Sequence, residues 1–348
     1  MYRAQRTDAA TEGLALMRVW GDNLPVTVPV ADKLRWQYTE NPSGAAEAFL
    51  LRAGDLAVGC AGITVRELAY AGHDVRTALL ADFAVDKAHR TGFPALVLQR
   101  AVKRHVDAAY QLSYGFPNAN AVAIHHRIGY QELGKMARYV RVLRHGAYLE
   151  KAYGRPLATR VAGAALDQAK LAVRLARTLR PARKNRLAWL TDVDARFDRL
   201  WRSARHTLGI ACRRDAAFLR WRCLREPGHP TTVAAMTDRA TGELRAYAMI
   251  RGGAGEPAHV VDLLGLDVGA LGDLLTLLAP ALYQRGHSAI VVRFLGDPRI
   301  PALLRAHHFA LRDAQRMVIV HAGTGCPIPA VTLTDATAWY LTDLDEDT

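Results

Sequence analysis

The chain carries one sequence pattern twice, in the same order, and this repeat constrains the fold more than any other feature. LRWQYTENP at residues 34–42 matches LRWRCLREP at residues 219–227. LLADFAV, which contains Asp82, matches HVVDLLGL, which contains Asp262, and three further segments match at spacings of 179 to 188 residues. Matches in one order at a nearly constant spacing indicate a tandem duplication, so we expect two copies of one folding unit.

Each copy predicts the same series of elements: a strand, a helix, a tryptophan-bearing segment, two or three strands, a helix, a strand, a helix and a strand. Such a series is typical of an α/β (α+β) fold, in which a central mixed sheet is flanked by helices. A chain of 348 residues is long enough for two such domains. We expect a first domain at residues 1–146, a basic linker helix at residues 147–185, and a second domain with a C-terminal extension at residues 186–348.

The formal net charge of +13 is concentrated between the two copies, because residues 151–190 hold ten lysines and arginines and a single acid. Within this stretch, the alanine-rich residues 158–179 predict a long helix with Lys170, Arg174 and Arg177 on one face. We expect this helix to brace the two domains with a solvated basic face. A peripheral contact with an anionic membrane surface or RNA is the alternative, although the near-balanced charge elsewhere makes nucleic acid an unexpected partner.

The composition is that of a globular chain, with half of the residues apolar and 23% charged. The opening residues contain no apolar run typical of a signal peptide, and no run of about eighteen apolar residues predicts a transmembrane helix. The four cysteines (Cys60, Cys212, Cys223 and Cys326) form no C-x-x-C pair, which favours thiols in a reducing compartment over disulfides or zinc. We therefore expect a cytoplasmic protein without a metal; the sequence leaves the oligomeric state open.

A short basic turn interrupts the stretch from Asp82 to Val102. The residues before it read as the end of a buried strand, and the apolar residues after Phe93 follow helical spacing. The turn itself, HRTGFP, contains a glycine and basic side chains. A strand, a basic glycine turn and a helix form a place where an anion can bind to backbone N–H groups.

This turn and the elements around it resemble the GNAT acetyltransferase superfamily over most of residues 1–146. In that superfamily the fourth strand leads into a Q/R-x-x-G-x-G/A loop, which binds the pyrophosphate of coenzyme A through backbone N–H groups. The resemblance implies that the loop here binds acetyl-CoA or another acyl-CoA as cosubstrate. Phe93 stands where the superfamily has a glycine. The residues that correspond to the loop are Arg90, Thr91, Gly92, Phe93 and Ala95.

The resemblance also implies catalytic positions. A backbone N–H of the fourth strand polarises the thioester carbonyl in this superfamily, which here means Phe83, Ala84 or Val85. In NANAVAIHHRIGY, Asn118 or Asn120 matches the signature asparagine of the following strand and helix, and we assign Asn120 to the coenzyme site.

The superfamily's tyrosine acid is replaced here by His125. An imidazolium near its ordinary pKa of about 6.5 could protonate the leaving thiolate. His126 is the alternative donor, and packing of His125 within its helix is the structural alternative.

Asp82, at the strand that precedes the turn, is the best-placed carboxylate for deprotonating an acceptor amine. Its repeat partner Asp262 lies in a copy without the basic glycine turn, which favours a structural role for this aspartate. A water relay to bulk solvent is a third possibility for the base.

Arg35, Trp36 and Tyr38 correspond to the superfamily's acceptor-facing segment and are candidate substrate-binding residues. An arginine beside two aromatic rings can bind a carboxylate, a phosphate or a sugar. Because Arg220 and Trp221 repeat the first two residues, packing is the alternative for Trp36 and a local anchor for Arg35. Tyr38 has no repeat equivalent.

Taken together, these features favour an N-acyltransferase of the GNAT type that acts on a small amine or amino sugar by direct transfer in a ternary complex. The second copy lacks the arginine and the glycine turn, so we expect one coenzyme site, in the first copy. A Fem-type transferase that uses aminoacyl-tRNA is one alternative. A catalytically silent acyl-CoA-binding or scaffold protein is the other.

Overall fold

The computed structural model describes residues 1–91, 93–144, 181 and 183–347. The linker helix expected at residues 158–179 lies outside these described residues. Its role as a brace stays a prediction, with the membrane or RNA contact as the alternative. The first half has the following order: β1 (Tyr2–Thr7), α1 (Gly13–Asn23), α2 (Val30–Leu34), the π-helical turn η1 (Arg35–Thr39), β2 (Glu47–Ala53), β3 (Leu56–Tyr70), β4 (His73–Val85), η2 (Lys87–His89), α3 (Phe93–Ala109), β5 (Leu112–Gly115), α4 (Ala119–Arg127) and β6 (Gln131–Val142).

The second half repeats this order, as the sequence predicts, and adds a short strand β8 and a C-terminal extension. Its elements are β7 (Asn185–Leu190), α7 (Ala195–Ala204), β8 (Ile210–Cys212), α8 (Ala216–Leu219), the π-helical turn η3 (Arg220–Leu224), β9 (Thr232–Asp238), β10 (Leu244–Arg251), β11 (Ala258–Gly265), α9 (Val268–Gln284), β12 (Ala289–Gly296), α10 (Arg299–Ala306) and β13 (Ala310–Ala322). The extension contains α11 (Ala330–Leu333), η4 (Ala336–Ala338), β14 (Trp339–Leu341) and η5 (Asp343–Asp345).

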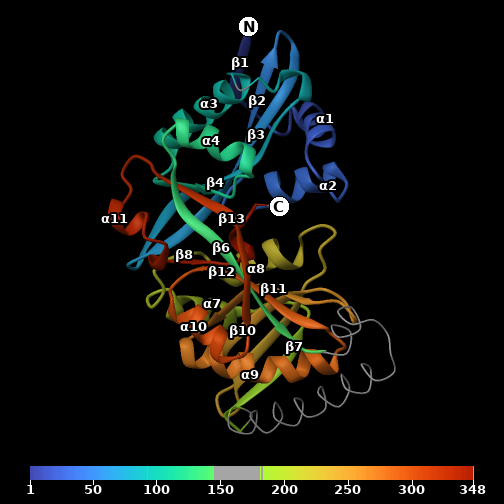
Figure 1. The fold of residues 1–348 in the computed structure, drawn as a ribbon, viewed down its shortest axis with the longest axis vertical. Helices are drawn as coiled ribbons and strands as arrows, with labels where there is room; N and C mark the ends of the chain where they lie inside the picture. The colour runs from blue at the N-terminus through green and yellow to red at the C-terminus, as the bar shows by residue number, and fades with distance from the viewer. Residues whose placement is uncertain (92, 145–180, 182, 348) are drawn as a thin grey trace.

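The two halves share one mixed sheet and exchange their last strands. The strand order is β1-β2-β3-β4-β5-β13-β6-β12-β11-β10-β9-β7. Thus β13 of the second half pairs with β5 of the first, β6 of the first half pairs with β12 of the second, and the two exchanged strands pair antiparallel with each other at the centre (Figure 1). Each half therefore completes the sheet of the other.

Helices cover both faces of the first half because its strands alternate apolar side chains between the faces. In β2, Phe49 and Leu51 pack with the apolar side of α3, whereas Ala48 and Leu50 pack with Leu16 and other residues of α1. Both sets are almost fully buried. The face of the sheet covered by α1 and α2 contributes one wall of the candidate site.

The two tryptophans of the repeated LRW motif meet at the junction of the halves. Trp36 in η1 and Trp221 in η3 stack with ring centroids 5.1 Å apart. Each indole Nε1 donates a hydrogen bond of 2.8 Å to the backbone oxygen of the other tryptophan. The motif thus joins equivalent points of the two halves in a reciprocal contact.

Among the described residues, no helix combines the length and apolar character needed to cross a membrane.

Candidate functional site

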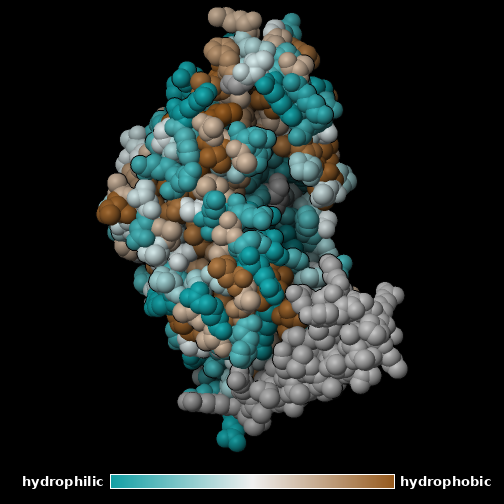
Figure 2. Space-filling view, in the orientation of Figure 1, coloured by the Kyte–Doolittle hydropathy of each residue, from teal (hydrophilic) through white to brown (hydrophobic). Residues whose placement is uncertain are grey.

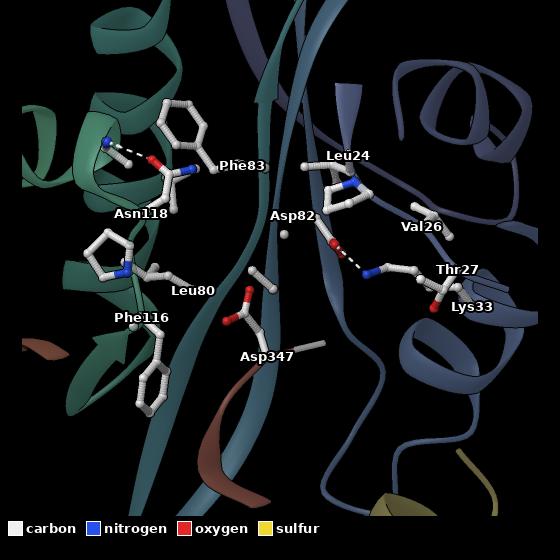
Figure 3. A pocket seen from close by; sticks show the side chains of 18 of the residues that line it. Leu24, Val26, Thr27, Lys33, Leu80, Asp82, Phe83, Phe116, Asn118 and Asp347 are labelled. Carbon is white, nitrogen blue, oxygen red and sulfur yellow. Dashed lines mark hydrogen bonds and ion pairs between the residues drawn. The ribbon is translucent and has the colours of Figure 1, made fainter. Parts of the chain in front are cut away.

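The neighbouring strands β4 and β5 separate midway along their length. They pair in parallel from Thr77 opposite Leu112 to Leu80 opposite Gly115. Beyond that point β4 continues as residues 81–85 while β5 ends and the chain turns into α4. The continuing part of β4 contains the predicted residues Phe83, Ala84 and Val85. Phe83 lies beside the opening in the sheet (Figure 3), whereas Ala84 and Val85 are not among the residues that line it.

A β-bulge shapes β4 at this opening. The pairing with β3 shifts register between Cys60 and Gly62, and Asp82 takes a positive φ of 52°, a conformation that is uncommon for residues other than glycine. The Asp82 carboxylate is almost fully buried and is held on both oxygens: Lys33 Nζ lies 2.7 Å from Oδ1, and the Tyr38 hydroxyl donates a 2.8 Å hydrogen bond to Oδ2. Burial and the neighbouring Asp82 raise the pKa of the Tyr38 phenol well above its usual value.

A cavity of about 270 Å³ opens at this point and is walled by both halves. In the space-filling view the surface is hollowed between the halves, with hydrophilic side chains around it (Figure 2). The lining residues are Leu24 to Val28, Lys33, Trp36, Ala61, Gly62, Leu80 to Phe83, Gln99, Val102, Gly115 to Asn118, Ala121 and His125 from the first half, and Glu226, Pro227, His229, Ile319 and Asp347 from the second half and its extension.

The loop after α1 and the loop after η3 meet at the cavity. Gly228 has a φ of 72°, and a Cβ atom there would lie 2.5 Å from Val28 Cγ1, so the close approach of these loops requires glycine. Beside it, Glu226 forms ion pairs with Arg222 and Arg251. Burial opposes ionisation of Glu226, but the two arginines outweigh it and lower the pKa of this carboxyl below its ordinary value.

Asp347 reaches the cavity from the C-terminal extension. Its carboxylate points into the open space beside Asp82, on the side of the cavity towards Leu80 and Phe116 (Figure 3). Burial, reinforced by the negative charge of Asp82, raises the pKa of Asp347 to about 6, against a partial opposing effect of Lys33. This carboxyl group therefore changes its charge just below neutral pH.

His125, the predicted proton donor, does line the cavity from α4. Its ring lies edge-on to Phe83 and Tyr130 at centroid distances of 6.1 and 5.3 Å, and its Nδ1 is buried with no hydrogen-bond partner among the described residues. Burial lowers the pKa of His125 to about 4. Burial therefore disfavours the imidazolium that the sequence predicts at this position, and a neutral ring would act through its N–H group.

The residues predicted for the coenzyme loop lie between β4 and α3. The side chain of Arg90 turns back, donating from Nε to the backbone oxygen of Val85 at 2.7 Å and from Nη2 to Asn23 at 3.0 Å. Thr91 and Phe93 are exposed, Ala95 is buried in the first turn of α3, and Gly92 lies outside the described residues.

The two signature asparagines of α4 differ in position. Asn118 caps the helix by accepting hydrogen bonds from the backbone N–H groups of Asn120 and Ala121, and it lines the cavity. Asn120, the residue assigned to coenzyme binding, is exposed at the start of α4 and is not among the lining residues.

The three candidate acceptor-binding residues are separated by the structure. Arg35 is exposed, forms ion pairs with Asp32 and Glu40, and does not line the cavity. Trp36 borders the cavity while packing on Trp221, and Tyr38 lies buried behind Asp82.

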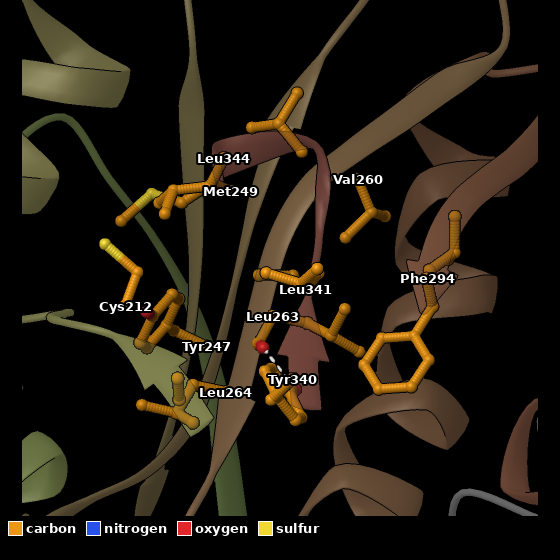
Figure 4. Close-up of a cluster of buried hydrophobic side chains, with 14 of the residues drawn as sticks. Cys212, Tyr247, Met249, Val260, Leu263, Leu264, Phe294, Tyr340, Leu341 and Leu344 are labelled. Atoms are coloured by element: carbon orange, nitrogen blue, oxygen red, sulfur yellow. Dashed lines mark hydrogen bonds between the residues drawn. The ribbon is translucent and has the colours of Figure 1, made fainter. Parts of the chain in front are cut away.

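The equivalent opening in the second half is filled by protein. There β11 pairs with β12 only from Ala258 to Val260, and β14 then pairs with the end of β12, at Leu295 and Gly296. Tyr340 of β14 donates a 2.7 Å hydrogen bond to the backbone oxygen of Leu263 on β11, so the strand spans the gap (Figure 4). The surrounding side chains form a compact apolar cluster.

Polar groups also occupy the place in the second half that corresponds to the cavity of the first half. Asp262, the equivalent of Asp82, binds Arg214 Nε at 3.0 Å and accepts from Tyr247 at 2.7 Å. Burial, its largest influence, raises the pKa of Asp262. At the start of α9 the carboxylate of Asp267 accepts the N–H of Ala270, placing a negative group where a helix N-terminus would otherwise attract an anion.

Within the described residues, no group of three or more histidine, cysteine or acidic side chains is arranged to hold a metal ion.

No family model and no curated protein matches the chain. Several solved structures share its fold. A conserved protein of unknown function from Enterococcus faecalis V583, described as a probable N-acyltransferase, has a TM-score of 0.65 and 10% identity over 92% of this chain and 73% of its own. Eis1 from Mycobacterium abscessus has a TM-score of 0.58 and 15% identity, covering 96% and 76%. A GCN5-related N-acetyltransferase from Kribbella flavida has a TM-score of 0.57 and 14% identity, covering 92% and 71%.

The chain therefore has the fold of the GCN5-related N-acetyltransferases, the GNAT fold, as its first-half motifs predict. At these identities the likeness defines the fold, while activity and substrates are argued from the site itself.

Sequence reasoning missed three charged groups of the cavity. Lys33 lies two residues before Arg35 of the LRW motif. Nothing in the sequence of its short helix, α2, marks it as a residue of the site. Glu226 belongs to the repeated segment at residues 219–227, where the first copy has Asn41 at the matching place, and that difference between the copies was a usable signal. Asp347 belongs to no repeat, and only the tertiary structure brings it to the site.

Proposed function

We propose that the chain is an acyl-CoA-dependent N-acyltransferase whose single site lies in the first half. The observation that carries this proposal is the separation of β4 from β5 at Leu80 and Gly115, with a cavity at the gap and the N-terminus of α3 beyond it. A gap between parallel strands admits an extended thioester arm, and the start of a helix attracts the negative pyrophosphate. The second half has its equivalent gap filled, which supports one site per chain.

The acyl-CoA would lie along the unpaired part of β4. The turn at residues 86–91 and the start of α3 would hold the pyrophosphate, and backbone N–H groups of residues 83–85 would polarise the thioester carbonyl. Asp82 is less suited to act as a base, because Lys33 and Tyr38 already occupy its two oxygens. Its role in this proposal is to hold the bulge that exposes the strand's polar groups.

The acceptor would enter the part of the cavity between the loop after α1 and the loop after η3. This part is walled by apolar residues such as Val26 and Val28 and by acidic groups of the second half. A cavity of about 270 Å³ fits a small molecule. A small amine or amino sugar is the acceptor class that these walls favour.

Unpaired cysteine thiols fit the cytoplasm as the compartment in which the protein acts.

His125 would donate a hydrogen bond to the sulfur of the leaving thiolate from its neutral ring. A neutral imidazole is a weaker acid than an imidazolium, so this group would stabilise the thiolate rather than protonate it fully. Its position at the cavity wall, beside Phe83, is the geometric basis for this role.

Replacing His125 by phenylalanine is expected to lower kcat about tenfold to a hundredfold while changing the affinity for acyl-CoA less than about threefold, because the hydrogen bond strengthens only as the thiolate forms. Steady-state kinetics and a coenzyme titration measure the two effects. His73→Phe, at the exposed start of β4, is the control. An unchanged kcat would return His125 to packing, and a loss confined to His126→Ala would transfer the role to its neighbour.

The function itself is tested by turnover. The chain is incubated with acetyl-CoA or longer acyl-CoA and with phenethylamine, histamine, putrescine or glucosamine, and release of free thiol is followed. Amine-dependent thiol release is expected. Coenzyme binding without any turnover would favour the silent binding protein, and turnover that requires aminoacyl-tRNA would favour the Fem-type transferase.

A further inference from the structure

We propose that Asp347 accepts the proton of the acceptor amine, and that the second half serves to hold this residue in the site of the first half. The proposal rests on the proposed function and deepens it, because it assigns the base and gives the filled second half a role. It follows from where the C-terminal extension runs after β14 (Figure 1).

The segment between β14 and Asp347 is anchored by buried arginines of the second half. Arg214 is fully buried, and its Nη2 donates to Asp345 Oδ2 at 2.7 Å. Arg222 is also buried and donates to the backbone oxygens of Leu344 at 3.1 Å and Glu346 at 3.0 Å. Buried charged hydrogen bonds at three successive residues leave this segment little conformational freedom.

The first half contributes to the same anchor. The hydroxyl of Tyr114 on β5 donates a 3.0 Å hydrogen bond to the backbone oxygen of Asp345. Thr342 and Asp345 also close a short capping box that shapes the turn η5. The segment is thus tied to both halves immediately before Asp347, which fixes where that side chain enters the cavity.

Asp347 is better placed to take a proton than Asp82. Asp82 has a lysine and a tyrosine on its two oxygens, whereas the Asp347 carboxylate is directed into the open cavity, towards Leu80 and Phe116 (Figure 3). A carboxylate there attracts an ammonium ion, so the same group would select a cationic amine and deprotonate it.

The proton balance is complete with the two substrates. The ammonium gives one proton to Asp347, and the neutral amine nitrogen attacks the thioester carbonyl carbon. The carbon–sulfur bond then breaks as the amide forms. The second amine proton passes to the thiolate, giving free coenzyme A, and Asp347 releases its proton to solvent.

The charged groups facing Asp347 define the expected pH dependence. Asp82 and Lys33 come from the first half, Arg222 and Arg316 from the second, and the Tyr38 hydroxyl lies behind Asp82. Burial and Asp82 outweigh the cations and raise the pKa of Asp347 to about 6. The base is active when ionised, so kcat/KM is expected to rise with pH through about 6.

Asp347→Asn tests the proposal. With acetyl-CoA and the best amine of the panel, we expect kcat/KM at pH 7.5 to fall about a hundredfold and the rise with pH near 6 to disappear. Asp347→Glu should restore part of the rate together with a pH-dependent rise. Coenzyme affinity and the melting temperature should match those of the wild type, because Asn keeps the size of the side chain. Asp335→Asn, an exposed carboxyl-to-amide change in the same extension, is the control, since asparagine caps a turn as well as aspartate does.

A variant ending at Asp345 provides a second test, because it keeps the contact with Arg214 and removes the carboxylate of Asp347. It should lose activity as Asp347→Asn does. If the wild type is active and the Asp347→Asn variant keeps the same rate and pH profile, this inference is overturned and the proposed function stands. A wild type that transfers no acyl group to any amine would overturn both.

Discussion

Replacing Arg214 by methionine is expected to lower the free energy of unfolding by about 3–5 kcal/mol, because removal of one partner leaves buried charges without compensation. Arg214 is fully buried and contacts Asp262, Asp345 and the backbone oxygen of Cys212. Methionine fills much of the volume but satisfies none of these acceptors. Chemical denaturation at pH 8 measures the loss.

The loss is expected to shrink at lower pH. Without the guanidinium, burial makes Asp262 bind a proton more tightly in the folded variant than in its unfolded chain, so the stability of the variant relative to the wild type falls as pH rises. The penalty should therefore be larger at pH 8 than at pH 5. Arg196→Met is the control, because Arg196 pairs with Asp194 at the surface and should cost at most about 1 kcal/mol. Equal losses in the two variants would show that the buried cluster does not stabilise the second half.

Replacing Trp221 by alanine should destabilise the chain by a similar amount, about 3–5 kcal/mol. The substitution removes a buried ring that stacks on Trp36, donates a hydrogen bond to it, and lies 5.0 Å from the buried guanidinium of Arg66. Thermal and chemical denaturation of the full chain measure the effect. Trp189→Ala, at a partly buried ring on β7, is the matched control and should lose less.

The reciprocal contact between Trp36 and Trp221 predicts that the two substitutions are not additive. Because Trp36 and Trp221 contact each other, Trp36→Ala combined with Trp221→Ala should cost clearly less than the sum of the two single losses. Strict additivity would mean that the rings stabilise the two halves independently and that the junction is not a shared unit.

The order of elements could be predicted because it depends on local periodicity. Residues such as Leu98 and Val102 of α3 repeat at helical spacing, and the repeat supplied a second reading of every element. The strand exchange could not be predicted in this way. The apolar residues of β6 and β13 suit pairing within their own half as well as pairing with the other half, and only the non-local contacts distinguish the two arrangements.

The sequence indicated residues whose positions depend on the order of the chain and missed those that depend on contacts between the halves. Phe83 and His125 line the cavity, as expected from their places in the repeat unit. The charge of His125 depends on burial, which sequence does not reveal. Arg35 was selected for its chemistry, yet its helix directs it to surface partners.

Asp347 shows most clearly which part of the site the sequence alone could not predict. It lies in the acidic segment LTDLDEDT, which has no helical or strand period and no counterpart in the first copy. Its position in the cavity depends on Arg214 and Arg222, which are more than a hundred residues earlier in the chain and hold the residues just before Asp347. A sequence pattern could not have joined these groups.

A crystal structure of the complex with coenzyme A tests the central claim most directly. The account predicts one coenzyme per chain, with its pyrophosphate over the turn before α3, its thiol arm between β4 and β5, and its sulfur near His125 and Asp82. A coenzyme bound between β11 and β12, in place of β14, would contradict the assignment of the site to the first half, as would a complex with one molecule in each half.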